Sequence, residues 1–218
     1  MSALDAREGY RLWAHDYHET AITFLDDLLV REMGPAPAGL RLLDAGCGTG
    51  RRLRGSGAAL AVGVDLTPEM LAAADPPGGL AAGDLRALPL RDAAFDLVWC
   101  RLAIGHLPEI GDAYRELARV CRPGGSVIVT DFHADAIAAG HRRTFCDASR
   151  RSHELAHYVH PAEAQAAAAR AAGLALAYRR DGEVGPAVRP FYERADRLGS
   201  YEKQQGLRLV LALAFRRE

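Results

Sequence analysis

The chain has 218 residues, of which 49% are hydrophobic and 25% are charged, and its formal net charge is −1 at pH 7. Length and composition are typical of one globular domain with a full core. The near-neutral charge excludes a broad electrostatic surface for nucleic acid or for an acidic membrane.

The cellular compartment of the protein can be inferred from its cysteines and from the absence of long apolar runs. Four scattered cysteines form no C-x-x-C pair, which indicates free thiols in a reducing compartment. No apolar run approaches the roughly 20 residues of a membrane helix, and residues 1–10 lack the apolar core of a signal peptide. We therefore expect a cytoplasmic protein without membrane attachment.

The first 33 residues place apolar side chains at near-helical spacing, which predicts a helical segment. Gly34-Pro35-Ala36-Pro37 ends this segment before the first strand.

An apolar run at residues 42–45 leads into a turn with glycines at alternate positions, Gly46, Gly48 and Gly50. This pattern predicts a buried strand followed by a loop where a ligand meets the backbone, because glycine has no side chain to block the approach. A second apolar run ends at Asp65, where a carboxylate can accept hydrogen bonds from a ribose. Together the two runs predict a nucleoside-binding α/β half-domain.

The glycine spacing distinguishes a dinucleotide from other nucleoside ligands. A dinucleotide fingerprint reads G-x-G-x-x-G, whereas this loop reads G-x-G-x-G. Asp44, just before the glycines, would repel a pyrophosphate and attract an ammonium or a sulfonium. Residues 44–50 resemble the first motif of the class I S-adenosylmethionine-dependent methyltransferases.

Further segments extend this resemblance over residues 40–132 in order. Gly83-Asp84-Leu85 closes a third apolar segment, and in the family the matching acidic residue contacts the adenine amino group while its neighbour flanks the ring. Residues 95–100 resemble the strand that ends beside the transferred methyl group, and residues 106–125 resemble the helix and turn before strand five. The resemblance thus implies S-adenosylmethionine as cofactor and the following cofactor-binding residues: Tyr17, Asp44, Gly46, Gly48, Asp65, Leu66, Asp84, Leu85 and Cys100. Core packing is an equal alternative for Tyr17.

The resemblance implies an α/β fold, with a Rossmann-like seven-stranded sheet, helices on both faces and a terminal antiparallel strand. Only ten residues, 51–60, separate the glycine loop from strand two, so we expect a short first helix of about two turns. The expected strands are residues 40–45, 61–65, 79–82, 95–100, 125–132, 174–180 and 207–217, with helices at 68–75, 109–121 and 161–172. Within this single domain we expect a lid at 1–33, a cofactor-binding core at 40–132, a cap insertion at 133–160, and a C-terminal helix and strand pair at 161–218.

The expected cap contains five of the eight histidines, and two of them belong to an H-E-x-x-H sequence, residues 153–157. On a helix, such histidines share one face and can bind zinc. Coincidence is frequent in a histidine-rich stretch, and positions 160 and 163 do not continue the longer zinc motif. The methyltransferase motifs also account for the preceding hundred residues, so we expect histidines that line a substrate pocket and no metal.

Methyl transfer is an in-line displacement in which a neutral acceptor can need its proton removed, and histidine suits that role. His106 and His133 each follow the carboxyl end of an inner strand, where ligands bind in open α/β sheets. Both are therefore candidate catalytic bases, and Asp131 is placed to orient His133. The alternatives are packing or hydrogen bonding near the cofactor for His106 and solvent exposure for His133.

Strand four ends in Cys100-Arg101-Leu102-Ala103 rather than in the Asp/Asn-Pro-Pro-Tyr signature of enzymes that methylate bases. We therefore expect a small-molecule acceptor with an oxygen or nitrogen nucleophile. A carboxylate on an acyl carrier is a further option, since a group of arginines could meet an acidic carrier: Arg142, Arg143, Arg150 and Arg151. Two alternatives stay open, a nicotinamide-dependent oxidoreductase and a non-catalytic S-adenosylmethionine-binding regulator. The sequence predicts no oligomeric state.

Overall fold

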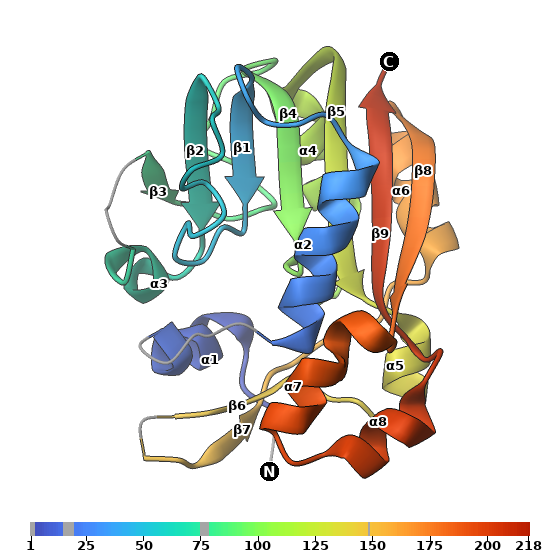
Figure 1. Cartoon of the computed structure of the whole chain (residues 1–218). Helices are drawn as coiled ribbons and strands as arrows, with labels where there is room; N and C mark the ends of the chain where they lie inside the picture. The colour runs from blue at the N-terminus through green and yellow to red at the C-terminus, as the bar shows by residue number, and fades with distance from the viewer. Residues whose placement is uncertain (1–2, 15–19, 75–78, 148) are drawn as a thin grey trace.

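The computed structural model describes residues 3–14, 20–74, 79–147 and 149–218, and a seven-stranded sheet runs through its centre (Figure 1). The strands of this sheet are β1 (Arg41–Ala45), β2 (Leu60–Asp65), β3 (Leu80–Ala82), β4 (Phe95–Arg101), β5 (Cys121–Phe132), β8 (Leu174–Glu183) and β9 (Arg208–Arg217). Their order is β3-β2-β1-β4-β5-β9-β8. The first five are parallel, and β9 is antiparallel to both β5 and β8. The predicted fold class is confirmed.

Helices cover both faces of the sheet. The helices are α1 (Ala6–Trp13), α2 (Ala21–Met33), α3 (Pro68–Ala72), α4 (Gly111–Val120), α5 (Ala134–Ala138), α6 (Ala162–Ala171), α7 (Arg189–Arg194) and α8 (Leu198–Gln204), with short 3-10 helices η2 (Ile104–His106) and η3 (Pro186–Val188). Among the described residues, no helix has the length and apolarity that crossing a membrane requires.

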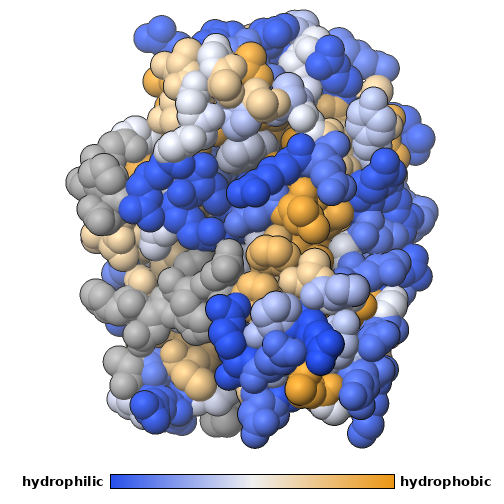
Figure 2. Space-filling model, in the orientation of Figure 1, coloured by the Kyte–Doolittle hydropathy of each residue, from blue (hydrophilic) through white to orange (hydrophobic). Residues whose placement is uncertain are grey.

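The alternation of side chains along the central strands explains why helices pack against both faces of the sheet. In β5, Val127 and Val129 pack in the same core cluster as Tyr114 of α4, while Ile128 between them packs in the cluster that contains Leu25 of α2. Successive side chains of a strand point to opposite faces, so a strand covered on both sides presents apolar side chains to both layers. Hydrophilic residues dominate the described outer surface in the view of Figure 2.

The N-terminal helical stretch that the sequence predicts consists of two helices, which lie in different parts of the fold. α2 contacts β5, β8 and β9 and is therefore part of the core, whereas α1 lies at the carboxyl edge of the sheet near α3 (Figure 1). Local sequence sets both starts. The Asp5 side chain accepts a hydrogen bond from the Glu8 amide at 2.9 Å, and Thr20 and Thr23 form a reciprocal capping box at the start of α2.

The prediction of a two-turn first helix between β1 and β2 was wrong, because residues 51–55 form only turns. The Leu53 amide bonds to the Gly50 carbonyl at 3.0 Å, and the Ser56 amide bonds to the Leu53 carbonyl at 3.3 Å. Gly55 has a φ of +65°, in the left-handed region that a helix cannot continue through. So short a crossover reaches β2 without a helix.

A fully buried carboxylate connects four elements beneath the carboxyl edge. Asp26 of α2 accepts hydrogen bonds from Thr130 at 2.6 Å, from Arg52 at 2.8 Å and from Arg101 at 2.8 Å. Asp27 completes the group by pairing with both arginines. The group thereby fixes α2 against the glycine loop and against the ends of β4 and β5.

We predict that Asp26→Asn lowers the free energy of unfolding by about 3 kcal/mol, because two buried guanidinium groups lose a charged partner while Asp27 retains part of the pairing. Urea denaturation at pH 7 measures this change. Glu193→Gln, which removes an exposed pair with Arg189, is the control and should change the same free energy by less than about 1 kcal/mol. Equal losses in the two variants would contradict the structural role of Asp26.

Candidate functional site

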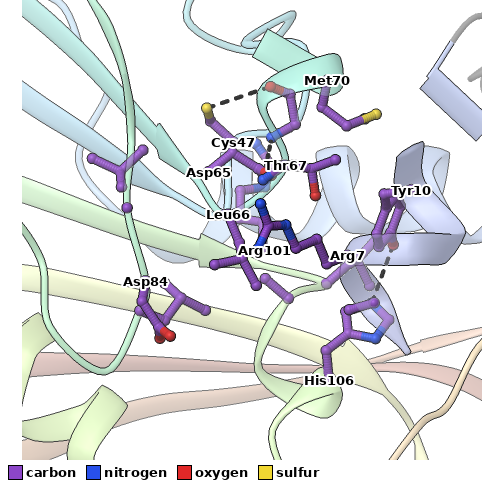
Figure 3. Close-up of a pocket in the computed structure, with 18 of the residues that line it drawn as sticks. Arg7, Tyr10, Cys47, Asp65, Leu66, Thr67, Met70, Asp84, Arg101 and His106 are labelled. Atoms are coloured by element: carbon purple, nitrogen blue, oxygen red, sulfur yellow. Dashed lines mark hydrogen bonds between the residues drawn. The ribbon is translucent and has the colours of Figure 1, made fainter.

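A cavity of about 380 Å³ lies at the carboxyl edge of the sheet, beyond the ends of β1, β2 and β4. Open α/β sheets bind ligands at this edge. The wall comes from the glycine loop, the segments after β2 and β3, the region around η2, and α1 (Figure 3). Seven of the residues singled out in the sequence line it: Gly46, Gly48, Asp65, Leu66, Asp84, Leu85 and His106.

The glycine loop holds the carboxylate of Asp65 at the cavity wall. Asp65 accepts hydrogen bonds from the Gly48 amide at 2.7 Å and from the Thr67 amide at 2.9 Å. Gly46 and Gly48 have φ values of +83° and +57°, and a Cβ at Gly46 would lie 2.5 Å from the Cβ of Ala103. Glycine is therefore required at Gly46 for the loop to approach the segment after β4.

Asp44 does not line the cavity but lies fully buried immediately behind the loop. Neither of its carboxylate oxygens has a hydrogen-bond partner in the described part of the chain. Burial raises the pKa of Asp44, against the opposing effect of Arg52 and Arg101. A buried carboxylate without a partner is costly, and a cationic ligand in the neighbouring cavity would reduce that cost. The arrangement thus fits a sulfonium nucleoside.

Asp84 lines the cavity as one half of a partly exposed ion pair. Its carboxylate accepts from Arg86 Nη2 at 2.6 Å and from Arg86 Nε at 3.0 Å. The hydrogen bonds from this guanidinium lower the pKa of Asp84. Asp84 is therefore an ionised acceptor at the wall that follows β3.

Of the predicted cofactor residues that the structure describes, Asp44 and Cys100 are not in the cavity wall. Cys100 is fully buried in β4, where burial raises the pKa of its thiol. Tyr17 lies outside the described residues.

His106 binds three separate segments that surround the cavity. Its Nε2 lies 2.7 Å from Arg143 Nη1 and 3.1 Å from the Tyr10 hydroxyl, and its Nδ1 lies 3.1 Å from the Ala156 carbonyl. Because a guanidinium can only donate, Nε2 is an acceptor, so the ring is neutral with its proton on Nδ1. Burial, with the charge of Arg143, holds the pKa of His106 well below its usual value. Both ring nitrogens are thus occupied.

These segments form one lid, which we define as residues 3–14, 141–147 and 149–158. Its hairpin consists of β6 (Thr144–Cys146) and β7 (Ser152–Glu154). Leu4 extends the hairpin, since its amide bonds to the Glu154 carbonyl at 2.8 Å and its carbonyl accepts from the Ala156 amide at 2.7 Å. Trp13 of α1 stacks on Phe145 with ring centroids 5.0 Å apart. The expected cap therefore packs against the N-terminal helix, which itself lines the cavity.

The structure does not bring His133, the other candidate base, to the cavity wall. His133 caps α5, where its Nδ1 accepts from the Asp135 amide at 3.0 Å. Its Nε2 faces Asp181 of β8 at 3.7 Å, and burial lowers the pKa of the ring. β5 continues to Phe132, so His133 lies beside β8 and β9, away from the end of β4.

The H-E-x-x-H residues are not on a helix. His153 lies in β7 and contacts Asp147 at 2.7 Å, whereas His157 follows the hairpin and contacts Asp131 at 3.1 Å. The two histidines thus bind different carboxylates. Across the described ranges, no three His, Cys, Asp or Glu side chains are grouped so as to hold a metal ion.

Sequence reasoning missed two lid residues in the cavity wall, Arg7 and Tyr10, and also missed Arg143, whose hydrogen-bond partners line the cavity. Arg143 was one of the arginines considered for contact with an acidic carrier, but it is buried. Arg7 and Tyr10 line the cavity from α1. No motif spacing connects positions 10, 106 and 143, so only the fold brings them together.

The fold and the cavity define a nucleoside-binding α/β protein, and the comparisons with known proteins specify the kind. Residues 43–129 match the methyltransferase domain family. A malonyl-[acyl-carrier protein] O-methyltransferase of Dechloromonas aromatica is 32% identical over 183 residues, 81% of this chain and 69% of that protein. One of the same name from Pseudescherichia vulneris is 36% identical over 147 residues, 64% of this chain and 57% of that protein.

A solved S-adenosylmethionine-dependent methyltransferase of Mesorhizobium loti shares the fold, with a TM-score of 0.67 and 23% identity over 88% of this chain and 98% of that one. The chain belongs to the class I S-adenosylmethionine-dependent methyltransferases, and S-adenosylmethionine is their cofactor, as the motifs predicted. The chain spans about half the length of several curated relatives that it matches, between 41% and 57% for three of them.

The state of His106 predicts a pH dependence of stability. The fold keeps His106 neutral, whereas the unfolded chain protonates it near pH 6.5. The contribution of the neutral ring to the free energy of unfolding is therefore complete above pH 6.5 and decreases as the pH falls below that value. Between pH 7.5 and pH 5.0, the wild type should lose about 2 kcal/mol more unfolding free energy than His106→Gln.

Denaturant titrations at several pH values measure this difference. Tyr10→Phe is the matched control, because it removes one hydrogen bond from His106 but retains the titrating ring. It should follow the wild-type pH profile, and parallel profiles for His106→Gln and the wild type would refute the assignment of a neutral, buried ring.

Proposed function

We propose that the protein transfers a methyl group from S-adenosylmethionine to an oxygen of a small-molecule acceptor. The observation that carries the proposal is the cavity itself, in which the glycine loop, the fixed carboxylate of Asp65 and the ionised Asp84 meet along one wall. The names of the O-methyltransferase relatives support oxygen as the acceptor atom.

When bound, S-adenosylmethionine supplies an electrophilic methyl group on a positively charged sulfur. In this proposal Asp65 accepts hydrogen bonds from the ribose hydroxyls with the lone pairs that its two backbone donors leave free. Asp84 accepts from the adenine amino group, and Asp44 balances the positive charge from behind the loop. α1 covers the opposite side of the cavity and excludes water from the reacting atoms.

The acceptor enters at the lid end of the cavity, where Tyr10 and His106 form the wall. An acyl group on a carrier protein is a suitable acceptor, as the relatives' names describe. Arg142, Arg150 and Arg151 are exposed on or beside the hairpin and offer positive charge to an acidic carrier. We also place the protein in the cytoplasm, since all four of its cysteines are free thiols.

Replacement of Asp65 tests the cofactor assignment. Asp65→Ala should weaken binding of S-adenosylhomocysteine by about 30-fold, because about 2 kcal/mol of charged hydrogen bonding to the ribose is lost. Isothermal titration calorimetry gives both dissociation constants. Asp112→Ala, at an exposed position on α4, should bind like the wild type.

The same titration separates a methyltransferase from a nicotinamide-dependent oxidoreductase. Binding of S-adenosylhomocysteine without binding of NAD supports the methyltransferase, and wild-type affinity in Asp65→Ala would overturn the cofactor site. Incubation with methyl-labelled S-adenosylmethionine and a malonyl thioester then tests transfer, which a non-catalytic regulator would not perform.

A further inference from the structure

The segment after β4 begins with a strained residue, Leu102. Its φ is +56°, and among the described residues it is the only buried residue other than glycine whose φ is positive. In a left-handed backbone the Cβ of leucine comes too close to the following carbonyl oxygen, whereas glycine adopts this conformation readily. Such a residue persists only where its surroundings hold it. Specific contacts must therefore keep Leu102 in this conformation.

Hydrogen bonds hold the Leu102 backbone from two sides. On the side of the sheet, its amide donates to the Thr130 carbonyl at 2.9 Å and to Thr130 Oγ1 at 3.2 Å. The Thr130 hydroxyl donates in turn to Asp26. On the side of the lid, the Leu102 carbonyl accepts from Arg143 Nη2 at 2.7 Å. The first contact belongs to β5 and the buried group around Asp26, whereas the second depends on one side chain of the lid.

Arg143 holds both ends of a short segment of the cavity wall. Besides the Leu102 carbonyl, its guanidinium bonds through Nη1 to His106 Nε2 at 2.7 Å. The residue is 7% exposed, and its guanidinium lies 5.0 Å from the ring centroid of Phe132. A guanidinium presents its donors in a fixed planar fork, and its charge strengthens each bond. The fork thus keeps Leu102 and His106 in a set relation, although Arg143 itself is not in the cavity wall.

The segment that Arg143 holds packs closely against the glycine loop. Ala103, directly after Leu102, lines the cavity together with Leu102 and His106. A Cβ at Gly46 would lie 2.5 Å from the Cβ of Ala103, so the two segments leave no room for a larger side chain. A change in the backbone of Leu102 would therefore move Ala103 relative to Gly46. Because both residues belong to the cavity wall, such a movement would change the shape of the cavity.

We propose that Arg143 is a positioning residue for cofactor binding, which keeps Leu102 in the left-handed conformation and thereby fixes Ala103 against the glycine loop. This inference rests on the proposed function, since S-adenosylmethionine is the ligand that the positioned wall meets. Arg143 lies outside the cavity wall, so its effect passes through the backbone of Leu102. Without Arg143, Leu102 relaxes toward an unstrained conformation and the wall fits the cofactor less well.

A double-mutant cycle with a strain-free residue at position 102 tests this role. Arg143→Gln should weaken binding of S-adenosylhomocysteine about tenfold, through the loss of one hydrogen bond from a charged group. In the Leu102→Gly background the same substitution should weaken binding less than about threefold, because glycine adopts the left-handed conformation without help. Isothermal titration calorimetry gives all four dissociation constants.

The rescue by glycine separates positioning from a loosened lid. Arg143 also bonds to His106, and a loss of affinity through the lid would be the same whether residue 102 is leucine or glycine. Ala93→Gly is the matched control, since Ala93 has a φ of +52° but lies outside the cavity wall. It should leave the loss in Arg143→Gln unchanged. Arg170→Gln, at an exposed position on α6, should bind S-adenosylhomocysteine like the wild type.

Two milder substitutions give the same comparison where circular dichroism shows that Arg143→Gln or Leu102→Gly does not fold. Arg143→Lys retains the charge, but a single ammonium does not reproduce the planar fork. Leu102→Asn accepts the left-handed backbone more readily than leucine does. Arg143→Lys should weaken binding of S-adenosylhomocysteine at least about threefold when residue 102 is leucine, and by a smaller factor in the Leu102→Asn background.

The outcomes distinguish this inference from the proposed function. Equal losses in the leucine background and in the glycine or asparagine background would overturn the inference while the proposed function stands. Wild-type affinity in Arg143→Gln would do the same. Failure of the wild type to bind S-adenosylhomocysteine would instead overturn the proposed function, and this inference with it.

Discussion

One neutral histidine, His106, connects the cavity wall to the three segments of the lid. A neutral imidazole has one donor and one acceptor, and His106 uses the first for the Ala156 carbonyl and the second for Arg143 and Tyr10. These partners come from three segments of the lid, so a single ring sets the position of all three. The same bonds leave His106 without a free lone pair, and this determines what chemistry the cavity can support.

Charge balance differs between the buried group around Asp26 and the lid. Beneath the carboxyl edge, Asp26 and Asp27 pair with Arg52 and Arg101 in a group that is complete without a ligand. In the lid, Arg143 is buried next to a histidine, a carbonyl and an aromatic ring. The first arrangement stabilises the fold, whereas the second joins the lid to His106 and to the Leu102 carbonyl.

The sequence predicted the parts of the site that follow directly from strand ends. Gly46, Asp65 and Asp84 each lie at or just after the end of a parallel strand, and such ends meet at one edge of a sheet, so local patterns were sufficient. The terminal antiparallel strand, β9, followed from the family resemblance. The contacts of His106 could not be predicted in this way, because its partners lie 96 and 37 residues away in the chain and depend on how the hairpin packs.

Two local patterns were misleading for physical reasons. The H-E-x-x-H spacing implies one helix face only where the segment is helical, and here its first half pairs with β6 as a strand. The ten residues between the glycine loop and β2 fit a short helix by length alone, but glycines with positive φ at Gly55 and Gly57 direct the chain through turns instead.

Hydrogen exchange measured on the wild type and on His106→Gln tests most directly whether one ring holds the lid in place. Amides in segments of low local stability exchange fastest. We expect the variant to exchange faster in both α1 and β7, which are far apart in the chain, while β1 and β4 exchange as in the wild type. Unchanged exchange in α1 and β7 would contradict the central role of His106.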